Sequence, residues 1–367
     1  MPSPRVYLDY NATAPVRPEV AEAMRPLLGL PLNPSSVHAE GRHARSIVET
    51  ARRTIAEHIG TFPNEIVFTG SGTEANNTVL RACAHLPFFL SGIEHPSLYK
   101  TARTLGNPAS IPVTPGGAVD REALERLLPA SGSFLLCVML ANNETGVIQP
   151  VAEIAAIAHA RGGLVHCDAA QALGKMPVDF SALGCDFMTL SAHKMGGPVG
   201  AAALLIRNGQ TLAPLLTGGG QELNRRAGTE QVAAIAGFAE AVRRIDLAQM
   251  QKLRQWLEAF ERAAPPNAVL FGASSPRLPN TTCIALPALK AETQVIRLDL
   301  SGIAVSAGAA CTSGKVEPSR ILRAMGADDR LAANAIRISG GWATREADIL
   351  ALTRAWGELG IRKTAAP

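Results

Sequence analysis

Residues 190–200 read LSAHKMGGPVG, and this stretch poses the first question about the fold. A largely apolar run, Cys185–Leu190, leads into Ser191, His193 and Lys194, and glycines and a proline follow. The run predicts a buried strand, and an ammonium group at the mouth of a buried strand is costly unless it reaches water. Two explanations are open. The ammonium reaches solvent, or this lysine is not a free ammonium in the working protein.

Similar apolar runs occur through the middle of the chain, and helical patterns alternate with them. The runs are EIVFTG (65–70), SFLLCVMLAN (133–142), GLVHCDA (163–169), CDFMTLSA (185–192) and AAALLIR (201–207). Helices are expected at about 73–84 and 151–161. Strands that are apolar on both sides and alternate with helices are typical of an α/β fold. We therefore expect a mostly parallel central sheet with helices on both faces.

The C-terminal third has a mixed pattern. A long helix is expected at about 230–262. Strands are then expected in NTTCIALP (280–287), GIAVSAG (302–308) and NAIRISGG (334–341), and helices in TQVIRLDL (293–300) and from about Thr344 onward. This organisation predicts a large domain over residues 15–262 and a smaller α+β domain built from residues 1–14 and 263–367.

Composition narrows the function class. Hydrophobic residues make up 47% and charged residues 18%, and the net charge is only +4. No basic cluster with interleaved aromatic residues occurs, so nucleic-acid binding is not expected. The apolar segments are too short to cross a membrane, and the N-terminus lacks a secretory pattern, which favours the cytoplasm.

The six cysteines fall into two groups. Cys83, Cys137, Cys167, Cys185 and Cys283 lie in apolar stretches and are expected to be buried thiols in a reducing compartment. Cys311 lies among small residues in SAGAACTSGK, which predicts an accessible loop.

Polar clusters follow four of the expected strands. They are GSGTEAN, NNETG, DAAQ and SAHK. Each cluster alone is weak evidence for a site. Because ligands of such sheets bind at the carboxyl ends of the strands, four clusters in this position indicate one shared site.

Two of these clusters have an ordinary structural explanation as well as a functional one. GSGTEANN (70–77) opens a helix, so its free N–H groups can hold a phosphate, or Ser71 or Thr73 can simply cap the helix. Asp168 either caps a helix or pairs with a cation such as a protonated heterocyclic nitrogen, and Gln171 is close enough in sequence to contact the same ligand.

Lys194 connects these features. Ser191 and His193 can hold a phosphate while the lysine reaches inward, where desolvation lowers its pKa and makes it a nucleophilic amine. Such an amine forms a Schiff base with an aldehyde. A phosphate loop, a carboxylate for a pyridine nitrogen and a Schiff-base lysine together indicate pyridoxal 5′-phosphate (PLP).

An ordered set of motifs then gives a specific resemblance. It comprises VYLDYNATAP, NPSSVHAEGR, EIVFTGSGTEANN, EHPS, NNETG, HCDAAQALGK, SAHKMGGPVG, GGGQELNRRAGTE, SAGAACTSGKVEPSRIL and IRIS. The chain resembles the class V aminotransferase group of fold-type I PLP enzymes, and within it the cysteine desulfurases of the nitrogen-fixation and iron–sulfur-assembly type. The resemblance spans nearly the whole chain.

The resemblance implies a role for each of the candidate site residues within these motifs. Lys194 would carry PLP, Asp168 would pair with the ring nitrogen, and Gln171 would contact the ring oxygen. His95 would stack on the ring and shuttle protons. The phosphate would be held by Gly72, Thr73, Ser191, His193 and, from the other subunit of a homodimer, Thr229. The substrate would be bound by Asn11, Asn143 and Arg337, with Arg337 clamping its carboxylate. Asn143 would also sit over the cofactor and so belong to its binding site.

The resemblance also implies the reaction. Cys311 would be the nucleophile that takes sulfur from L-cysteine as a persulfide and leaves L-alanine, with His95 as the expected acceptor of its thiol proton. This sulfurtransferase would pass sulfur to an iron–sulfur scaffold or another acceptor protein. Cys311 would then also be a candidate transient ligand of an iron–sulfur cluster.

Rival functions and departures from the family pattern stay open at this stage. The rivals are selenocysteine lyase, another class V PLP reaction, and an idle regulatory homologue; the intact motif residues argue against the last. Tyr10 stands where a smaller residue is commoner, and ISGGWATRE replaces the usual pattern, so Trp342 is expected to affect access to the pocket. The short tail RKTAAP leaves docking of a partner protein open.

Overall fold

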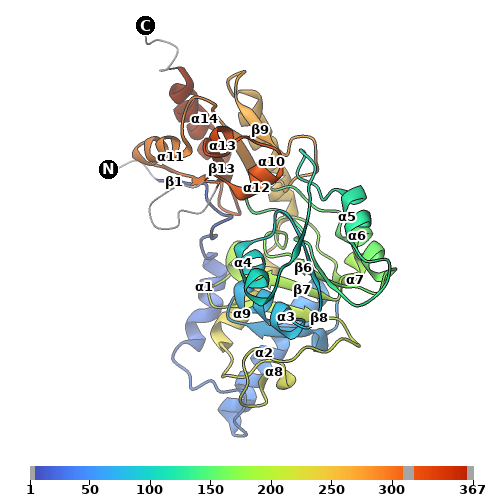
Figure 1. Ribbon diagram of the computed structural model, residues 1–367. Helices are drawn as coiled ribbons and strands as arrows, with labels where there is room; N and C mark the ends of the chain where they lie inside the picture. The colour runs from blue at the N-terminus through green and yellow to red at the C-terminus, as the bar shows by residue number, and fades with distance from the viewer. Residues whose placement is uncertain (1–4, 309–317, 362–367) are drawn as a thin grey trace.

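The computed structural model describes residues 5–308 and 318–361. Its larger sheet has seven strands in the order β2-β8-β7-β6-β5-β3-β4. Figure 1 labels β6, β7 and β8 of this sheet. The strands are β2 (Ile66–Thr69), β3 (Phe88–Ser91), β4 (Ala109–Ile111), β5 (Leu135–Cys137), β6 (Leu164–Asp168), β7 (Phe187–Ser191) and β8 (Ala202–Ile206). Only β8 is antiparallel to its neighbours, β2 and β7. The expected mostly parallel sheet is therefore confirmed.

Helices cover both faces of this sheet, and the period of two along each strand decides which side chains meet which helices. In β2, Val67 packs in a core with α3 (Gly72–Ala82) and α4 (Pro96–Leu105). The next residue, Phe68, points to the opposite face, where α2 (Ala39–His58), α6 (Val151–His159) and α9 (Val232–Arg243) pack. Burial on both faces explains why the strands read as continuous apolar runs.

The expected long helix over 230–262 is wrong. The chain forms two helices, α9 and α10 (Leu247–Arg262). Asp246 lies between them and caps α10, because its side chain accepts a hydrogen bond from the Gln249 N–H at 3.0 Å. An aspartate favours such a cap over the middle of a helix.

A second sheet has four antiparallel strands in the order β12-β13-β10-β9. They are β9 (Val269–Phe271), β10 (Thr281–Ala285), β12 (Ser306–Ala307) and β13 (Ala335–Ser339). The N-terminal β1 (Val6–Tyr7) pairs in parallel with β11 (Ile303–Ala304) beside it. The helices α10, α11 (Ala291–Leu300) and α14 (Glu346–Ile361) pack in the core of this part. The domain limits 15–262 and 263–367 remain a prediction.

The remaining elements are short. The helices are α1 (Pro18–Met24), α5 (Arg121–Leu127), α7 (Phe180–Leu183), α8 (Gln221–Asn224), α12 (Arg320–Ala324) and α13 (Asp329–Ala332). The 3₁₀ turns are η1 (Arg25–Leu27), η2 (Pro63–Glu65) and η3 (Ala192–Lys194). Of these, η3 directly follows β7 and carries the lysine of the opening motif.

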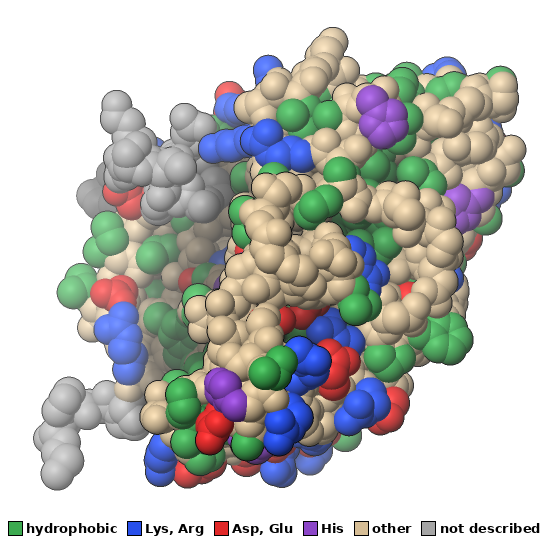
Figure 2. Space-filling model, turned by 90° about the horizontal axis from the view of Figure 1, so that it is seen from below, with side chains coloured by type: hydrophobic (Ala, Val, Ile, Leu, Met, Phe, Trp, Pro, Cys, Tyr) green, Lys and Arg blue, Asp and Glu red, His purple; other side chains and the backbone are tan. Residues whose placement is uncertain are grey.

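The surface and the cysteines agree with the composition. On the face in Figure 2, Lys and Arg side chains are interspersed with Asp and Glu. No helix within residues 5–308 and 318–361 is long and apolar enough to cross a membrane. The five cysteines Cys83, Cys137, Cys167, Cys185 and Cys283 are buried and unpaired, as expected.

Candidate functional site

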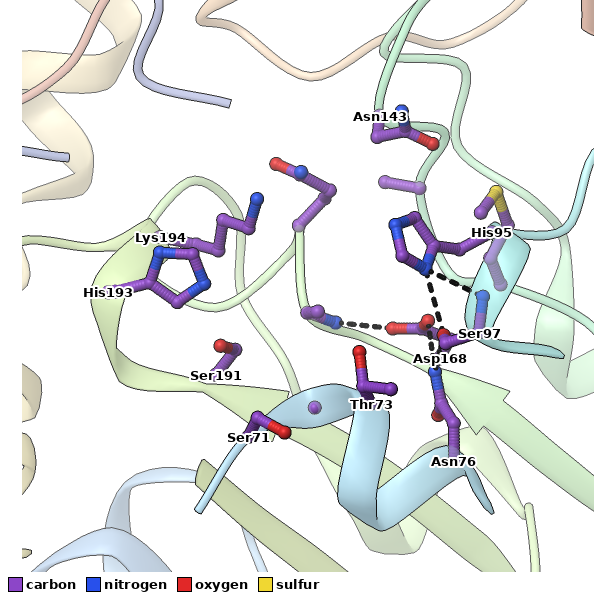
Figure 3. A pocket seen from close by; sticks show the side chains of 15 residues that line it. Ser71, Thr73, Asn76, His95, Ser97, Asn143, Asp168, Ser191, His193 and Lys194 are labelled. Carbon is purple, nitrogen blue, oxygen red and sulfur yellow. Dashed lines mark hydrogen bonds between the residues drawn. The ribbon is translucent and has the colours of Figure 1, made fainter. Parts of the chain in front are cut away.

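A cavity of about 260 Å³ lies at the carboxyl ends of β2, β5, β6 and β7, where the four polar clusters meet. Helix α3 starts at its floor, and the side chains of η3 and α4 face each other across it (Figure 3). Nine of the predicted site residues line this cavity: Gly72, Thr73, His95, Asn143, Asp168, Gln171, Ser191, His193 and Lys194. The sheet thus brings together side chains that are far apart in sequence, as its topology requires.

Lys194 ends η3 and points into the cavity (Figure 3). Its Nζ donates hydrogen bonds to the backbone oxygens of Asn11 at 2.6 Å and Ala12 at 2.8 Å. Burial, together with the charge of Arg337, lowers the pKa of Lys194 to about 8. About a tenth of this amine is therefore uncharged at pH 7, far more than for an ordinary lysine, which favours a reactive amine as the answer to the opening question.

Asp168 is the buried carboxylate of the site and is 6% exposed. Its Oδ2 accepts a hydrogen bond from Asn76 Nδ2 at 2.8 Å, and its Oδ1 accepts one from the Ala170 N–H at 3.0 Å. Among the described residues, no cationic side chain forms an ion pair with it. A buried carboxylate without a cation suits a ligand that brings its own positive charge.

The floor of the cavity suits an anion. Ser71 caps α3, because its Oγ accepts from the Glu74 N–H at 3.1 Å, and the backbone of Gly72 and Thr73 forms the first turn. The positive end of the helix dipole therefore faces the cavity. Ser191 and His193 line the same region. Burial, with the charges of Lys194 and Lys175, lowers the pKa of His193 to about 4, which leaves a neutral ring beside the anion site.

A second cavity of about 380 Å³ adjoins the first and shares His95, Asn143, Gln171 and Lys194 with it. Arg337, on β13, reaches this cavity from the smaller sheet. Its Nη2 forms an ion pair with Asp9 Oδ1 at 2.6 Å, and its Nη1 donates to the Asn143 backbone oxygen at 3.1 Å. Asn11 also lines this cavity.

Two buried polar atoms at this cavity have no partner within residues 5–308 and 318–361. They are Arg337 Nε and Asn143 Oδ1. Unpaired buried donors and acceptors are costly, so a ligand that pairs with them is expected. A guanidinium with a free Nε–H suits a carboxylate bound by two parallel hydrogen bonds.

Thr229 is a predicted site residue that is not brought to these cavities: it is exposed and lines neither of them. Cys311 lies outside the described residues. The described residues on either side of its segment, Gly308 and Pro318, both line the second cavity.

The structure adds polar residues that the sequence did not single out. Lys175 is 4% exposed, and its Nζ donates to Asn11 Oδ1 at 2.8 Å and to Gln171 Oε1 at 2.5 Å. Glu144 lines the second cavity and accepts a hydrogen bond from Ser319. Lys175 lies in the motif HCDAAQALGK, four residues after Gln171, and Glu144 lies in NNETG, next to Asn143. Their place within these motifs is the only sequence feature that could have identified them as site residues.

The departures from the family pattern form a packed cluster. The ring of Tyr10 lies against Gly341, where an added Cβ would come within 2.0 Å of it. Trp342 donates from its indole to the Pro15 oxygen at 2.9 Å, and the Arg17 guanidinium lies 5.2 Å from the centre of its ring. Neither Tyr10 nor Trp342 lines the two cavities described above. Both line a smaller cavity of about 20 Å³ together with Lys194, and the expected effect of Trp342 on access stays a prediction.

Comparison with known proteins agrees with this geometry. The aminotransferase class-V family model matches residues 6–352. A cysteine desulfurase of Enterobacter agglomerans is 39% identical over 360 residues, covering 94% of this chain and 90% of the relative. Cysteine desulfurase IscS of Dictyoglomus turgidum is 38% identical and covers 94% of this chain and 91% of the relative.

A solved structure gives the same result at the level of the fold. The NifS-like protein from Rickettsia africae superposes with a TM-score of 0.90 at 38% identity, covering 97% of this chain and 99% of that one. Similarity of this extent in both sequence and structure shows the family. The chain belongs to the class V aminotransferase family, and within it to the cysteine desulfurases.

Proposed function

We propose that the protein removes sulfur from L-cysteine, with PLP as cofactor, and forms L-alanine and a persulfide on Cys311. The observation that carries the proposal is the pairing of two adjoining cavities. One is lined by an amine, an uncompensated carboxylate and a helix start. The other is lined by Arg337 and by Gly308 and Pro318, the described residues on either side of the segment that bears Cys311.

The residues of the first cavity fit PLP. The helix start at Gly72 and Thr73 suits its phosphate, and Asp168, which lacks a cationic partner, suits a protonated pyridine nitrogen. Lys194 Nζ suits its aldehyde. When bound, the cofactor supplies the electron sink that makes bonds at the substrate's α-carbon labile.

The chain itself supplies binding and proton transfer. Arg337 orients the substrate carboxylate through its Nε–H, which is unpaired within the described residues, while the unpaired Asn143 Oδ1 can accept a hydrogen bond from a donor of the bound ligand. Lys194 Nζ, with a pKa of about 8, can take up and return a proton near neutral pH. The overall exchange balances without an external oxidant: cysteine and the Cys311 thiol give alanine and the Cys311 persulfide.

Further parts of the proposal concern partners. We propose a homodimer in the cytoplasm that hands the persulfide sulfur to an iron–sulfur scaffold or another acceptor protein. Two features support the dimer. Thr229 is exposed and away from its own cavities, and large apolar side chains are exposed at Leu28, Val37, Val199 and Leu223.

The test is release of sulfide and alanine from L-cysteine in the presence of a thiol reductant. The wild type should give equal amounts of both. Cys311→Ala should keep the yellow colour of the bound cofactor and lose sulfide release, whereas Cys83→Ala, which removes a thiol outside both cavities, should stay active.

Other outcomes point to the rivals. Equal sulfide release by wild type and Cys311→Ala would exclude Cys311 as the nucleophile. If neither protein reacts with cysteine, the proposal fails, and selenocysteine and pairs of amino and keto acids become the substrates to try. A colourless protein that binds no PLP would indicate an idle homologue.

A further inference from the structure

His95 has two different surroundings on its two ring nitrogens. Nδ1 faces the start of helix α4, for which His95 is the N-terminal cap, and it accepts a hydrogen bond from the Ser97 N–H at 3.2 Å. The other nitrogen, Nε2, is turned toward the cavity (Figure 3). A nitrogen that caps a helix must offer a lone pair, so this contact requires Nδ1 without a proton.

The Ser97 hydroxyl makes the same demand. Asn76 Nδ2 donates to Ser97 Oγ at 2.8 Å and to Asp168 Oδ2 at 2.8 Å. A flipped Asn76 amide would set its oxygen against the carboxylate of Asp168, so the orientation is determined. Because Ser97 Oγ accepts from Asn76, its own hydrogen is available to donate, and His95 Nδ1 lies 2.8 Å away.

Asn76 is itself held from its other side. Its Oδ1 lies 2.9 Å from His166 Nε2, and His166 is fully buried. A continuous series of hydrogen-bond contacts therefore runs from His166 through Asn76 and Ser97 to His95. Asp168 fixes the orientation of the Asn76 amide, because its carboxylate can only accept a hydrogen bond from Asn76 Nδ2. Figure 3 shows the part of this network that borders the cavity.

The electrostatic surroundings favour a neutral ring. Burial lowers the pKa of His95, and the charges of Lys194 and Arg320 act in the same direction, whereas Asp168 opposes them. The positive end of the α4 dipole also disfavours an imidazolium at the cap position.

We propose that Ser97 is a positioning residue that holds His95 as the neutral tautomer with its proton on Nε2. His95 then presents a hydrogen-bond donor to the cavity, not a base. In this state Nε2 already carries its proton and Nδ1 is occupied by two donors. On this proposal the ring does not take the thiol proton of Cys311, which differs from the role that the resemblance implies.

The consequence for catalysis rests on the proposed function. A neutral N–H that faces the cavity stabilises negative charge on the bound substrate by hydrogen bonding, without transfer of a proton. The tautomer itself does not depend on which substrate the protein uses.

The direct test is ¹⁵N NMR of the PLP-loaded protein labelled at histidine. The spectrum of His95→Gln identifies the two signals of His95 by their loss. At neutral pH we expect a pyrrole-type signal for Nε2 and a pyridine-type signal for Nδ1. A protonated Nδ1, either as the other tautomer or as imidazolium, would overturn the proposal.

The variant test concerns Ser97. Ser97→Ala removes one donor to Nδ1, so the pKa of His95 read from its ¹⁵N shifts should rise by about one unit, as expected for one hydrogen bond. Ser97→Thr keeps the hydroxyl and should restore the wild-type titration. An unchanged titration in Ser97→Ala would contradict the role of the hydroxyl.

The two proposals can fail separately. If the wild type forms no alanine from cysteine but shows the expected ¹⁵N signals, the proposed function fails and the tautomer stands. If alanine forms but Nδ1 is protonated, the proposed function stands and the inference about Ser97 fails.

Discussion

Arg337 is held in place by two of its nitrogens and keeps the third for a ligand. Its two terminal nitrogens contact Asp9 and the Asn143 backbone, while its buried Nε has no partner within the described residues. Lysine offers a single charged centre and cannot reproduce this fork. Arg337→Lys should therefore raise KM for cysteine by about 10- to 100-fold, the loss of one charge-assisted hydrogen bond, with a smaller change in kcat.

The measurement is the initial rate of alanine formation over a range of cysteine concentrations. Arg323→Lys is the matched control, because Arg323 forms an exposed ion pair with Asp329 and lines neither cavity of the site. Its KM should equal that of the wild type. An unchanged KM in Arg337→Lys would remove Arg337 from the binding of the substrate carboxylate.

At the scale of elements, Glu144 joins the loop after β5 to helix α12. Ser319 caps α12 and donates from its Oγ to Glu144 Oε2 at 2.5 Å. Burial raises the pKa of Glu144 to about 7, although Ser319, Arg337 and Arg320 act to lower it. The folded chain thus binds this proton more tightly than the unfolded chain, whose glutamate has an ordinary pKa of 4.5.

The sign of the pH dependence follows from this shift. Stability from the Glu144 proton is complete below pH 4.5 and is lost as the pH rises through about 7. Glu144→Gln is neutral throughout, so its stability relative to the wild type should increase by about 3 kcal/mol from low to high pH. Thermal midpoints of both proteins at pH 5 and pH 9 measure this difference.

An exposed glutamate on helix α5 provides the comparison. Glu122→Gln should differ from the wild type by the same small amount at both pH values, because its carboxyl group is in contact with water. If the midpoint difference for Glu144→Gln were also independent of pH, its carboxyl group would not titrate between 4.5 and 7.

Elements were also the scale at which the sequence was most informative. Apolar runs predicted β2, β6, β7 and β8, because a strand that is covered on both faces has apolar residues at nearly every position and is therefore easy to recognise. The short β4 and β9 have three residues each and no comparable signal. The break between α9 and α10 was missed because a capping aspartate looks like any exposed residue of a helix.

The residues of the candidate site also fall into a group that the sequence predicted and a group that it did not. Residues that follow strands were predicted together, because the topology brings strand ends to one edge. Ser97 and Lys175 were not, since their importance depends on contacts with Asn76 and Gln171 that only the folded chain defines. The same limit applies to the unpaired Nε of Arg337, which is a property of packing and not of sequence.

At the scale of the whole molecule, the position of Thr229 bears on how the site is completed. Every other predicted phosphate-binding residue lines the first cavity, but Thr229 is exposed and does not. In a symmetric dimer, a residue that projects from one subunit can complete the site of the other. We therefore expect Thr229 to act on the cofactor of the partner subunit.

Mixed dimers test this expectation. Thr229→Glu places a carboxylate near the phosphate, so its homodimer should lose PLP and activity, as should the Lys194→Ala homodimer. In a heterodimer, one chain has an intact Lys194 and the other has an intact Thr229. These two residues can meet in one active site only if Thr229 acts across the interface. Heterodimers purified through two different affinity tags should then regain up to half of the wild-type rate of alanine formation.

Inactive heterodimers would show that Thr229 serves its own subunit. An active Thr229→Glu homodimer would show that Thr229 does not contribute to the site. Thr104→Glu, at an exposed threonine of α4, should stay active and shows that an added carboxylate alone does no harm.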